Sequence, residues 1–316
     1  MAHSIDQLLD RAAGLLESGR KVALCLLVGT RGSTPASPGA MMLVDDAAEL
    51  YGTVGGGCVE AEVRRRVFEM IGLDRTGLLQ FKLDHDYGWD DGLICGGTID
   101  VAVALPADSN GLRAVANAYR HREPTDLSVV VDPGEGADRQ RYVLDLPPRP
   151  RLLIAGAGHI GQALCRLAFD LDFDVAVFDD RHDLLERFIP DPARRVVGPI
   201  DETIVAEPID DGTYIVIVTR GHRHDEQVLK AVAGKPARYL GMIGSRRKVK
   251  LTFDELRVTG VSEEALQRVQ APIGVDIGSV TVNELALAIA AQLVEARRAD
   301  YRSPVRGPLA PDPTPA

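Results

Sequence analysis

The stretch RLLIAGAGHIG, residues 151–161, decides the fold of the second half of the chain. An apolar run typical of a buried strand leads directly into Gly156, Gly158 and Gly161, which have the spacing G-x-G-x-x-G. Each glycine has a physical role in such a turn: the first permits a tight bend, the second leaves room for a pyrophosphate, and the third lets a helix pack closely on the strand. The N-terminus of that helix offers N–H groups and a partial positive charge to an anion.

Beyond this turn, predicted strands and helices alternate over residues 151–300. The next strand, DVAVFD, ends at Asp179, which is followed by Asp180 and Arg181. An acid at this position holds the ribose 2′-OH in dinucleotide-binding proteins. Strands that alternate with helices of this length indicate a parallel sheet with right-handed crossovers. We therefore predict a Rossmann-type doubly wound domain over 151–300, with NAD(P) as one candidate ligand.

Ligands of a doubly wound sheet bind beyond the carboxyl ends of its strands, so the loops after four predicted strands should line one crevice. In one of these loops Ser245 is a predicted helix cap, and the basic first turn that follows suits a phosphate. The alternative is a solvated basic helix end. The candidate ligand-binding residues of the crevice are Gly156, Gly158, His159, Gly161, Asp179, Asp180, Arg181, Arg220, His222, Ser245, Arg246 and Arg247.

His222 and His224 form an H-x-H pair, which on a strand would place both imidazole rings on one face. No third ligand follows at a spacing typical of metal sites, and Asp225 resembles a helix cap. The pattern therefore favours a cofactor contact or a plain loop over a metal site.

Composition limits the class of protein. The 316 residues are 45% hydrophobic, which is enough for two cores, and the net charge of −10 argues against nucleic acid or an anionic membrane as a partner. The N-terminus carries acids where a signal peptide would be basic, and the richest apolar stretch, LALAIAAQLV, is about half the ~20 residues that span a bilayer. These features predict a cytoplasmic protein without a membrane partner.

Prolines mark the predicted domain boundary. LPPRP, residues 146–150, favours an extended linker, because proline cannot donate a ladder hydrogen bond. We therefore predict an N-terminal domain over residues 1–146 and a Pro-rich tail over residues 303–316. The composition of the tail indicates disorder or an arm lying on a neighbour, and the apolar helices together with this tail suggest a homodimer.

The first half of the chain is expected to be mixed α/β. Helical spacing in IDQLLDRAAGLLESG predicts an N-terminal helix, and KVALCLLVG and AMMLV predict buried strands. CVEAEVRRRVFEMI predicts an amphipathic helix, and TIDVAVAL alternates like a half-buried strand. The second helix begins directly after a cluster of glycines, GTVGGGC, residues 52–58.

Two of the four cysteines stand beside glycine clusters. Cys58 follows three glycines and opens the predicted helix, where the dipole favours a thiolate although Glu60 opposes it, and Cys95 directly precedes Gly96. Cys25 and Cys165 lie in apolar runs and resemble buried small hydrophobes. C-x₂-C pairs are absent, so a soft ligand held by thiolates, or sulfur transfer, fits better than zinc or an iron–sulfur cluster. The candidate ligand-binding residues of this domain are Gly55, Gly56, Gly57, Cys58, Cys95 and Gly96.

Taken together, the motifs resemble those of the XdhC/CoxI family, accessory factors of xanthine dehydrogenase and carbon monoxide dehydrogenase. The resemblance covers most of the chain. Its first half carries GTRGSTPASPGAMMLV, GTVGGGCVEAEV and CGGTIDV, and its second half carries IAGAGHIGQAL, VFDDR, VTRGHRHDEQVL, RYLGMIGSRRKV and APIGVDIGS. A small departure is Val282, where many relatives have proline at the first position of a helix.

This resemblance implies a chaperone rather than a catalyst. Such a factor binds molybdenum cofactor (molybdopterin, as the monophosphate or a dinucleotide) and protects it while a cysteine desulfurase supplies sulfur. It then delivers the cofactor to a molybdenum hydroxylase apoenzyme. Cys58 and Cys95 fall on the two cysteine motifs of the family, so the resemblance assigns them the molybdenum or sulfur contact.

Two other functions remain open from the sequence. One is an NAD(P)- or flavin-dependent oxidoreductase that uses the Rossmann crevice, with His159, His222 and His224 as the candidate proton donors. The other is a regulatory nucleotide-binding module in which the thiols are incidental.

Overall fold

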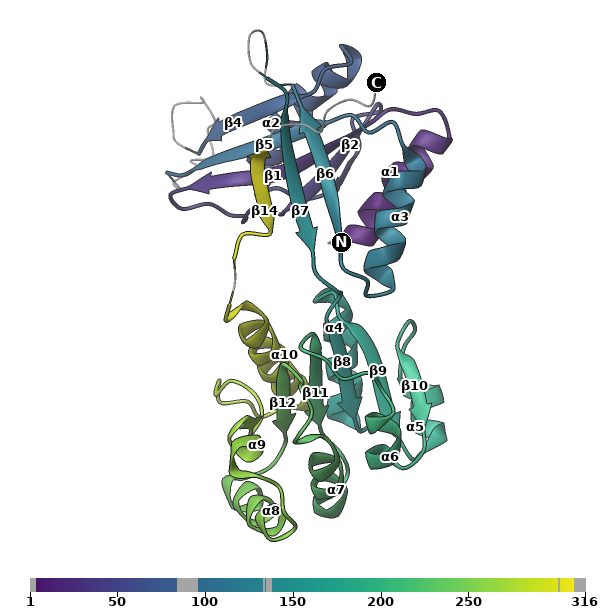
Figure 1. The fold of residues 1–316 in the computed structure, drawn as a ribbon, viewed down its shortest axis with the longest axis vertical. Helices are drawn as coiled ribbons and strands as arrows, with labels where there is room; N and C mark the ends of the chain where they lie inside the picture. The colour runs from purple at the N-terminus through teal and green to yellow at the C-terminus, as the bar shows by residue number, and fades with distance from the viewer. Residues whose placement is uncertain (1–3, 84–95, 133, 135–137, 301, 310–316) are drawn as a thin grey trace. The chain divides into compact units, whose positions relative to one another are not determined.

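The computed structural model describes residues 4–83, 96–132, 134, 138–300 and 302–309. It divides into a first unit, Met1–Pro148 with Arg302–Ala316, and a second unit, Arg149–Tyr301. Figure 1 shows both units, of which the first contains two sheets and the second contains one. Within the described ranges, no helix is both long enough and apolar enough to cross a membrane.

The first unit contains a five-stranded antiparallel sheet in the order β3-β2-β1-β5-β4 and a three-stranded sheet in the order β14-β7-β6. The strands are β1 (Val22–Arg31), β2 (Met41–Asp45), β3 (Leu50–Gly52), β4 (Gly77–Lys82), β5 (Thr98–Ala104), β6 (Thr125–Val131), β7 (Gln140–Leu146) and β14 (Val305–Leu309). The helices are α1 (Ile5–Glu17), α2 (Gly57–Gly72) and α3 (Ser109–Arg120).

Strand β1 is the centre of this unit, since both of its faces are buried. Leu24 and Leu26 pack into one core with α1, α3 and the β6–β7 hairpin, whereas Cys25 and Leu27 pack into a second core with α2. Alternation of side chains along a strand places neighbours on opposite faces. A strand covered on both sides therefore needs the unbroken apolar sequence VALCLL, which confirms the prediction of a buried strand.

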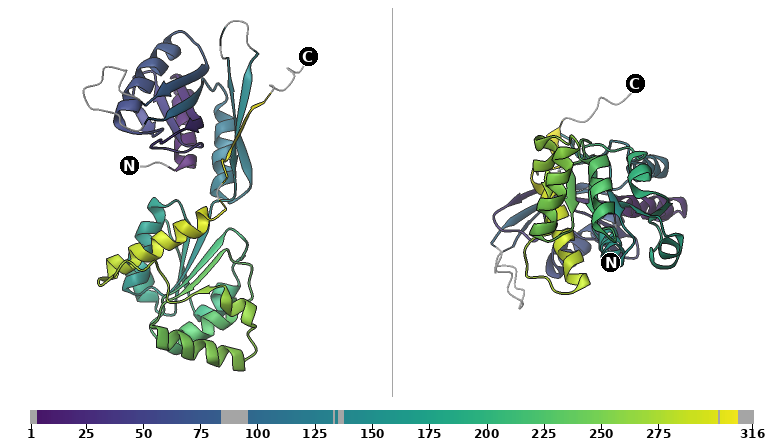
Figure 2. Two further views of the ribbon diagram at one scale, coloured as in Figure 1. Left: turned by 90° about the vertical axis from the view of Figure 1, so that its left-hand side faces the viewer. Right: turned by 90° about the horizontal axis from the view of Figure 1, so that it is seen from below.

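Within the predicted Pro-rich tail, the described residues 305–309 differ from the expectation of disorder or an arm on a neighbour. Residues Val305–Leu309 form β14, which pairs antiparallel with β7 of the first unit (Figure 2). Arg306 also donates hydrogen bonds to both carboxylate oxygens of Asp145. The pairing uses backbone groups, which a strand sequence containing Gly307 and Pro308 still provides at a sheet edge. Composition alone did not reveal it.

The second unit is a six-stranded, entirely parallel sheet in the order β10-β9-β8-β11-β12-β13. This is the strand order 3-2-1-4-5-6 of the Rossmann fold, so the predicted doubly wound domain is confirmed. The chain reverses direction across the sheet between β8 and β11, where such folds bind ligands. The strands are β8 (Arg151–Ala155), β9 (Asp174–Asp179), β10 (Arg194–Val197), β11 (Thr213–Ile217), β12 (Tyr239–Met242) and β13 (Val269–Gln270).

Helices cover both faces of this sheet. Helices α4 and α10 share one core with β8 and β9, whereas α6, α7 and α8 pack in a core on the other face (Figure 2). Thr281 and Glu284 form the predicted capping box at the start of α10. The helices are α4 (His159–Asp170), α5 (His182–Phe188), α6 (Ile200–Val205), α7 (His222–Val232), α8 (Arg246–Val258), α9 (Glu263–Gln267) and α10 (Val282–Arg298).

The three glycines of the fingerprint meet three different constraints. Gly156 has φ +119°, and a Cβ there would lie 2.5 Å from the carbonyl oxygen of Val218. A Cβ on Gly161 would lie 2.0 Å from the carbonyl oxygen of Gly156, so α4 packs directly on the turn. Gly158 is the N-cap of α4, and a Cβ there would meet nothing within 4 Å. The first and third glycines are therefore required by the fold, whereas the second leaves open space.

This difference predicts that two alanine substitutions destabilise the fold to unequal extents. We expect Gly161→Ala to lower the free energy of unfolding by at least about 2 kcal/mol, because the clash is with backbone that cannot rotate away. Gly158→Ala should cost less than about 1 kcal/mol, since alanine is only a poorer N-cap than glycine. Chemical denaturation of the two variants beside the wild type measures both values. Equal losses would contradict the division of roles.

Candidate functional site

The carboxyl ends of β8, β9, β11 and β12 bring the predicted loops of the second unit together. Arg220, after β11, donates a hydrogen bond of 2.7 Å to a carboxylate oxygen of Asp180, after β9. The close approach of Gly156 to Val218 joins the loops after β8 and β11. The predicted loops are thus in contact with one another, and a ligand-binding crevice between them stays a prediction.

Asp179 is the most constrained residue of this crevice. Its side chain is buried, and its two oxygens accept four hydrogen bonds: one from the Ala157 N–H, at 2.8 Å, and three from Arg181. Burial raises the pKa of Asp179, but these hydrogen bonds outweigh it and lower the pKa to about 2. The carboxylate therefore locks the glycine turn to the end of β9.

Asp180 differs from its neighbour in exposure. Its side chain is 38% exposed, and it pairs with Arg220 and, at 3.9 Å, with Arg181. The lone pairs of Asp179 are already used by protein donors, so Asp180 is the acid with room for a ribose hydroxyl. A ribose contact by either residue remains a prediction.

The structure does not place His222 and His224 on a strand, where their two rings would share one face. Both lie in the first turn of α7 rather than on a strand, and a spacing of two residues does not place them on one face of a helix. Gly221 at the N-cap allows α7 to begin here. Asp225 is buried, and one carboxylate oxygen accepts hydrogen bonds from the N–H and hydroxyl of Thr219.

The start of α8 has the predicted cap. The hydroxyl of Ser245 accepts a hydrogen bond of 3.3 Å from the Lys248 N–H. Lys248 itself turns toward α7 and forms an ion pair with buried Asp225, a contact that the sequence pattern does not reveal. Arg246 and Arg247 are exposed, and they form no ion pair with the other described residues. Two of the three basic residues are thus available to an anion.

In the first unit, the loop that follows β1 contacts both glycine clusters, residues 55–57 and residues 96–97. A Cβ on Gly97 would lie 2.2 Å from the carbonyl oxygen of Ser33, and Ser33 forms a bridge with Gly96. Further along the same loop, the Pro35 ring lies 3.5 Å from the Cβ position of Gly55. Both clusters therefore lie against the loop that follows β1, at one end of the sheet.

This end of the sheet exposes backbone. A Cβ on Gly56, Gly57 or Gly96 would meet no atom within 4 Å, and Gly56 caps α2 without a side chain. The first N–H groups of α2 therefore have no side-chain cap. Cys58 lies in the first turn of α2, but its side chain is outside the described part of the structure, as is Cys95.

The other two cysteines are structural. Burial raises the pKa of Cys25 to about 12 and that of Cys165 to about 11. Both thiols stay protonated at neutral pH and line the cores, as predicted. Of the four cysteines, this leaves Cys58 and Cys95 as the candidates for thiolate chemistry.

Fold and site together define a two-unit α/β protein. Its second unit is a Rossmann domain, and its first unit has a glycine–cysteine end, where the glycine clusters beside Cys58 and Cys95 lie against the loop after β1. A family model described as the XdhC Rossmann domain matches residues 152–293, and a second, described as the XdhC and CoxI family, matches residues 15–82. The chain belongs to the XdhC and CoxI family.

Several known proteins are similar to this chain over most of its length. The uncharacterized protein YqeB of Escherichia coli is 28% identical over 92% of this chain, which spans 46% of the length of YqeB. The molybdenum cofactor insertion chaperone PaoD of Escherichia coli is 27% identical, over 92% of this chain and 88% of PaoD. A Bacillus subtilis protein named as a probable xanthine dehydrogenase component is 23% identical, over 90% of this chain and 96% of that protein.

A crystal structure described as a xanthine dehydrogenase from Bacillus halodurans has the same fold. It superposes with a TM-score of 0.80, covering 95% of this chain and 98% of that one, at 20% sequence identity.

The bonds of Asp179 predict a pH-dependent loss of stability in Asp179→Asn. The folded pKa of about 2 lies below the ~3.9 of an unfolded chain, a difference that contributes about 2.5 kcal/mol at neutral pH. Because the folded pKa is the lower one, this contribution is present above about pH 4 and is lost as the pH falls toward 2. Urea denaturation at about pH 7 and about pH 3 should show the variant and wild type converging in acid.

Asp180→Asn is the matched control for this experiment. Its exposed ion pairs should contribute less than about 1 kcal/mol at any pH. A loss for Asp179→Asn no larger than that for Asp180→Asn would show that the buried carboxylate does not hold the turn.

Proposed function

We propose that this protein is an accessory chaperone that binds molybdenum cofactor, supports its sulfuration, and inserts it into a molybdenum hydroxylase of the xanthine or carbon monoxide dehydrogenase type. The observation that carries the proposal is the likeness to PaoD, a molybdenum cofactor insertion chaperone, across 92% of this chain. The partners in this proposal are the hydroxylase apoenzyme and a cysteine desulfurase that supplies the sulfur.

The glycine–cysteine end of the first unit suits such a cargo. Molybdopterin is flat and anionic, so it needs close approach to backbone and donors for a phosphate. The open Cβ positions at Gly56, Gly57 and Gly96 give that approach, and the start of α2 presents N–H groups without a side-chain cap. Cys58 and Cys95 are the proposed soft ligands, since thiolates bind soft metals better than oxygen ligands do.

The crevice of the second unit has a separate part in the proposal. A dinucleotide form of the cofactor, or NAD(P), would place its pyrophosphate over Gly158, the fingerprint glycine with free space around it. Arg246 and Arg247 at the start of α8 are the proposed phosphate contacts, and Asp180 is the proposed ribose contact. No residue of the crevice is assigned a catalytic step.

Equilibrium binding under anaerobic conditions tests the proposal. We expect the wild-type protein to bind isolated molybdenum cofactor and Cys58→Ala or Cys95→Ala to lose about tenfold or more in affinity, equivalent to at least about 1.4 kcal/mol per thiolate. Cys165→Ala is the matched control, because it also removes one thiol but from a buried site, and its affinity should equal that of the wild type.

Titration with NAD(H) in the same series separates the rival function. Binding of NAD(H) without affinity for the cofactor would favour an oxidoreductase that uses the crevice. Cofactor affinity that equals the wild-type value in all three cysteine variants would show that neither Cys58 nor Cys95 contacts the cofactor.

A further inference from the structure

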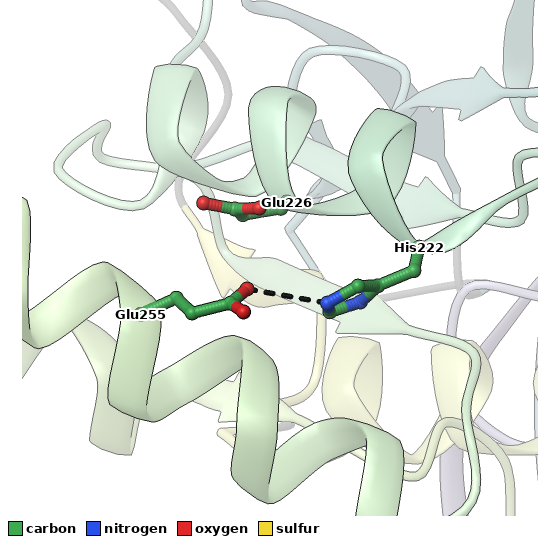
Figure 3. A group of neighbouring side chains, drawn as sticks. All are labelled: His222, Glu226 and Glu255. Carbon is green, nitrogen blue, oxygen red and sulfur yellow. Dashed lines mark ion pairs between the residues drawn. The ribbon is translucent and has the colours of Figure 1, made fainter.

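Three potential metal ligands meet in the second unit, between α7 and α8. His222 and Glu226 lie one turn apart on α7, and Glu255 faces them from α8 (Figure 3). Their ligand atoms all lie within 4.8 Å of one another, and His222 Nε2 is 3.2 Å from a carboxylate oxygen of Glu255. The side chains converge on one point from two helices.

A buried hydroxyl sets which nitrogen of His222 faces this point. Thr252 is fully buried, and its hydroxyl donates a hydrogen bond of 3.0 Å to the carbonyl oxygen of Lys248. Its oxygen also lies 3.2 Å from His222 Nδ1, so this contact orients the imidazole ring. Nδ1 is turned toward Thr252, and the other nitrogen, Nε2, is the one beside the carboxylate of Glu255.

This arrangement suits a cation. His222 Nε2 lies 3.2 Å from a carboxylate oxygen of Glu255, and Glu226 adds a second carboxylate to the same point. A metal ion between the three groups would be coordinated by the imidazole and by both carboxylates.

The two helices that carry the ligands are fixed to each other. Buried Asp225 on α7 pairs with Lys248 on α8 and also holds Thr219, so the relative position of the helices does not depend on an ion. Ligands on rigid elements, with an outer hydrogen bond that orients the imidazole, are the typical construction of a metal site.

We propose that His222, Glu226 and Glu255 form a site for a divalent first-row transition ion, with zinc as the best match. One imidazole and two carboxylates suit zinc, and they leave a fourth position for water or a ligand. Donors around zinc at about 2.1 Å lie roughly 3.4 Å apart, so the carboxylates have to close in slightly. Both glutamates are incompletely buried and can rotate.

This site goes beyond the proposed function, because it requires neither a cysteine nor molybdenum. It lies next to the turn that carries Arg220, at the carboxyl end of β11. A bound ion would cross-link the start of α7 to the middle of α8. The fourth position would offer an electrophilic contact to an anionic or carbonyl group.

Titration with Co²⁺, the spectroscopic substitute for zinc, tests the site in the full-length protein after treatment with a chelator. We expect d–d absorbance without the charge-transfer band of thiolate ligation, and displacement of Co²⁺ by Zn²⁺. Glu226→Gln and Glu255→Gln should each abolish this signal. Thr252→Val should weaken Co²⁺ binding by about 10–100-fold, the usual effect of losing an outer-shell partner.

His222→Gln and His224→Gln form the matched pair for the imidazole. His224 is two residues away on the same helix, and its ring lies 3.5 Å from Arg220 rather than in the cluster. Binding lost in His222→Gln and kept in His224→Gln supports the site. Binding that survives in Glu226→Gln, Glu255→Gln and His222→Gln, or that shows only thiolate bands, overturns it. Circular dichroism of each variant confirms that it is folded.

Discussion

One buried carboxylate organises the carboxyl edge of the sheet in the second unit. Asp179 stands at the end of β9, yet it accepts a hydrogen bond from Ala157, inside the glycine turn that follows β8. A charge taken out of water is strongly unfavourable unless it is fully hydrogen-bonded, and four donors satisfy this one. The turn, the strand end and Arg181 are therefore held as a single rigid group.

A similar set of contacts fixes α7 and α8. Asp225 is a second buried carboxylate, bonded on one oxygen to Thr219 and on the other to Lys248. Each buried acid thus connects a loop at the carboxyl end of the sheet to a neighbouring element. Removal of either carboxylate would leave a basic partner and several hydrogen-bond donors without an acceptor. The primary role of both acids is therefore to hold these loops and helices in position.

The sequence predicted the elements of the second unit well, because fully buried strands and amphipathic helices differ strongly in pattern. RLLIA and TYIVI are continuous apolar runs in parallel strands, and the fingerprint glycines mark the first turn without ambiguity. Local pattern cannot report how the lone pairs of Asp179 are used, since its partner Ala157 is 22 residues away. It also cannot find Glu255 opposite His222, because the two meet only when α7 packs beside α8.

The first unit was less predictable for a related reason. Strand β14 has a sequence with proline and glycine, and its pairing with β7 depends on backbone groups from the far end of the chain. The apolar run around Leu24 and Cys25 predicted a strand that is buried on both faces. It did not predict which helices pack on each face. At the glycine–cysteine end, the shared contact with the loop after β1 forms only in the folded sheet.

The charges at the crevice decide what kind of ligand it can attract. The protein as a whole carries −10, and Arg181, Arg220 and Lys248 are already paired with carboxylates, so neither the global field nor these residues favour an anion. Arg246 and Arg247 remain, beside the N–H groups of the first turn of α8. Attraction from two guanidinium groups and a helix end is screened within about 10 Å. The ligand that we propose for these loops is therefore a compact anion, such as the phosphate of a nucleotide, rather than an extended acidic surface.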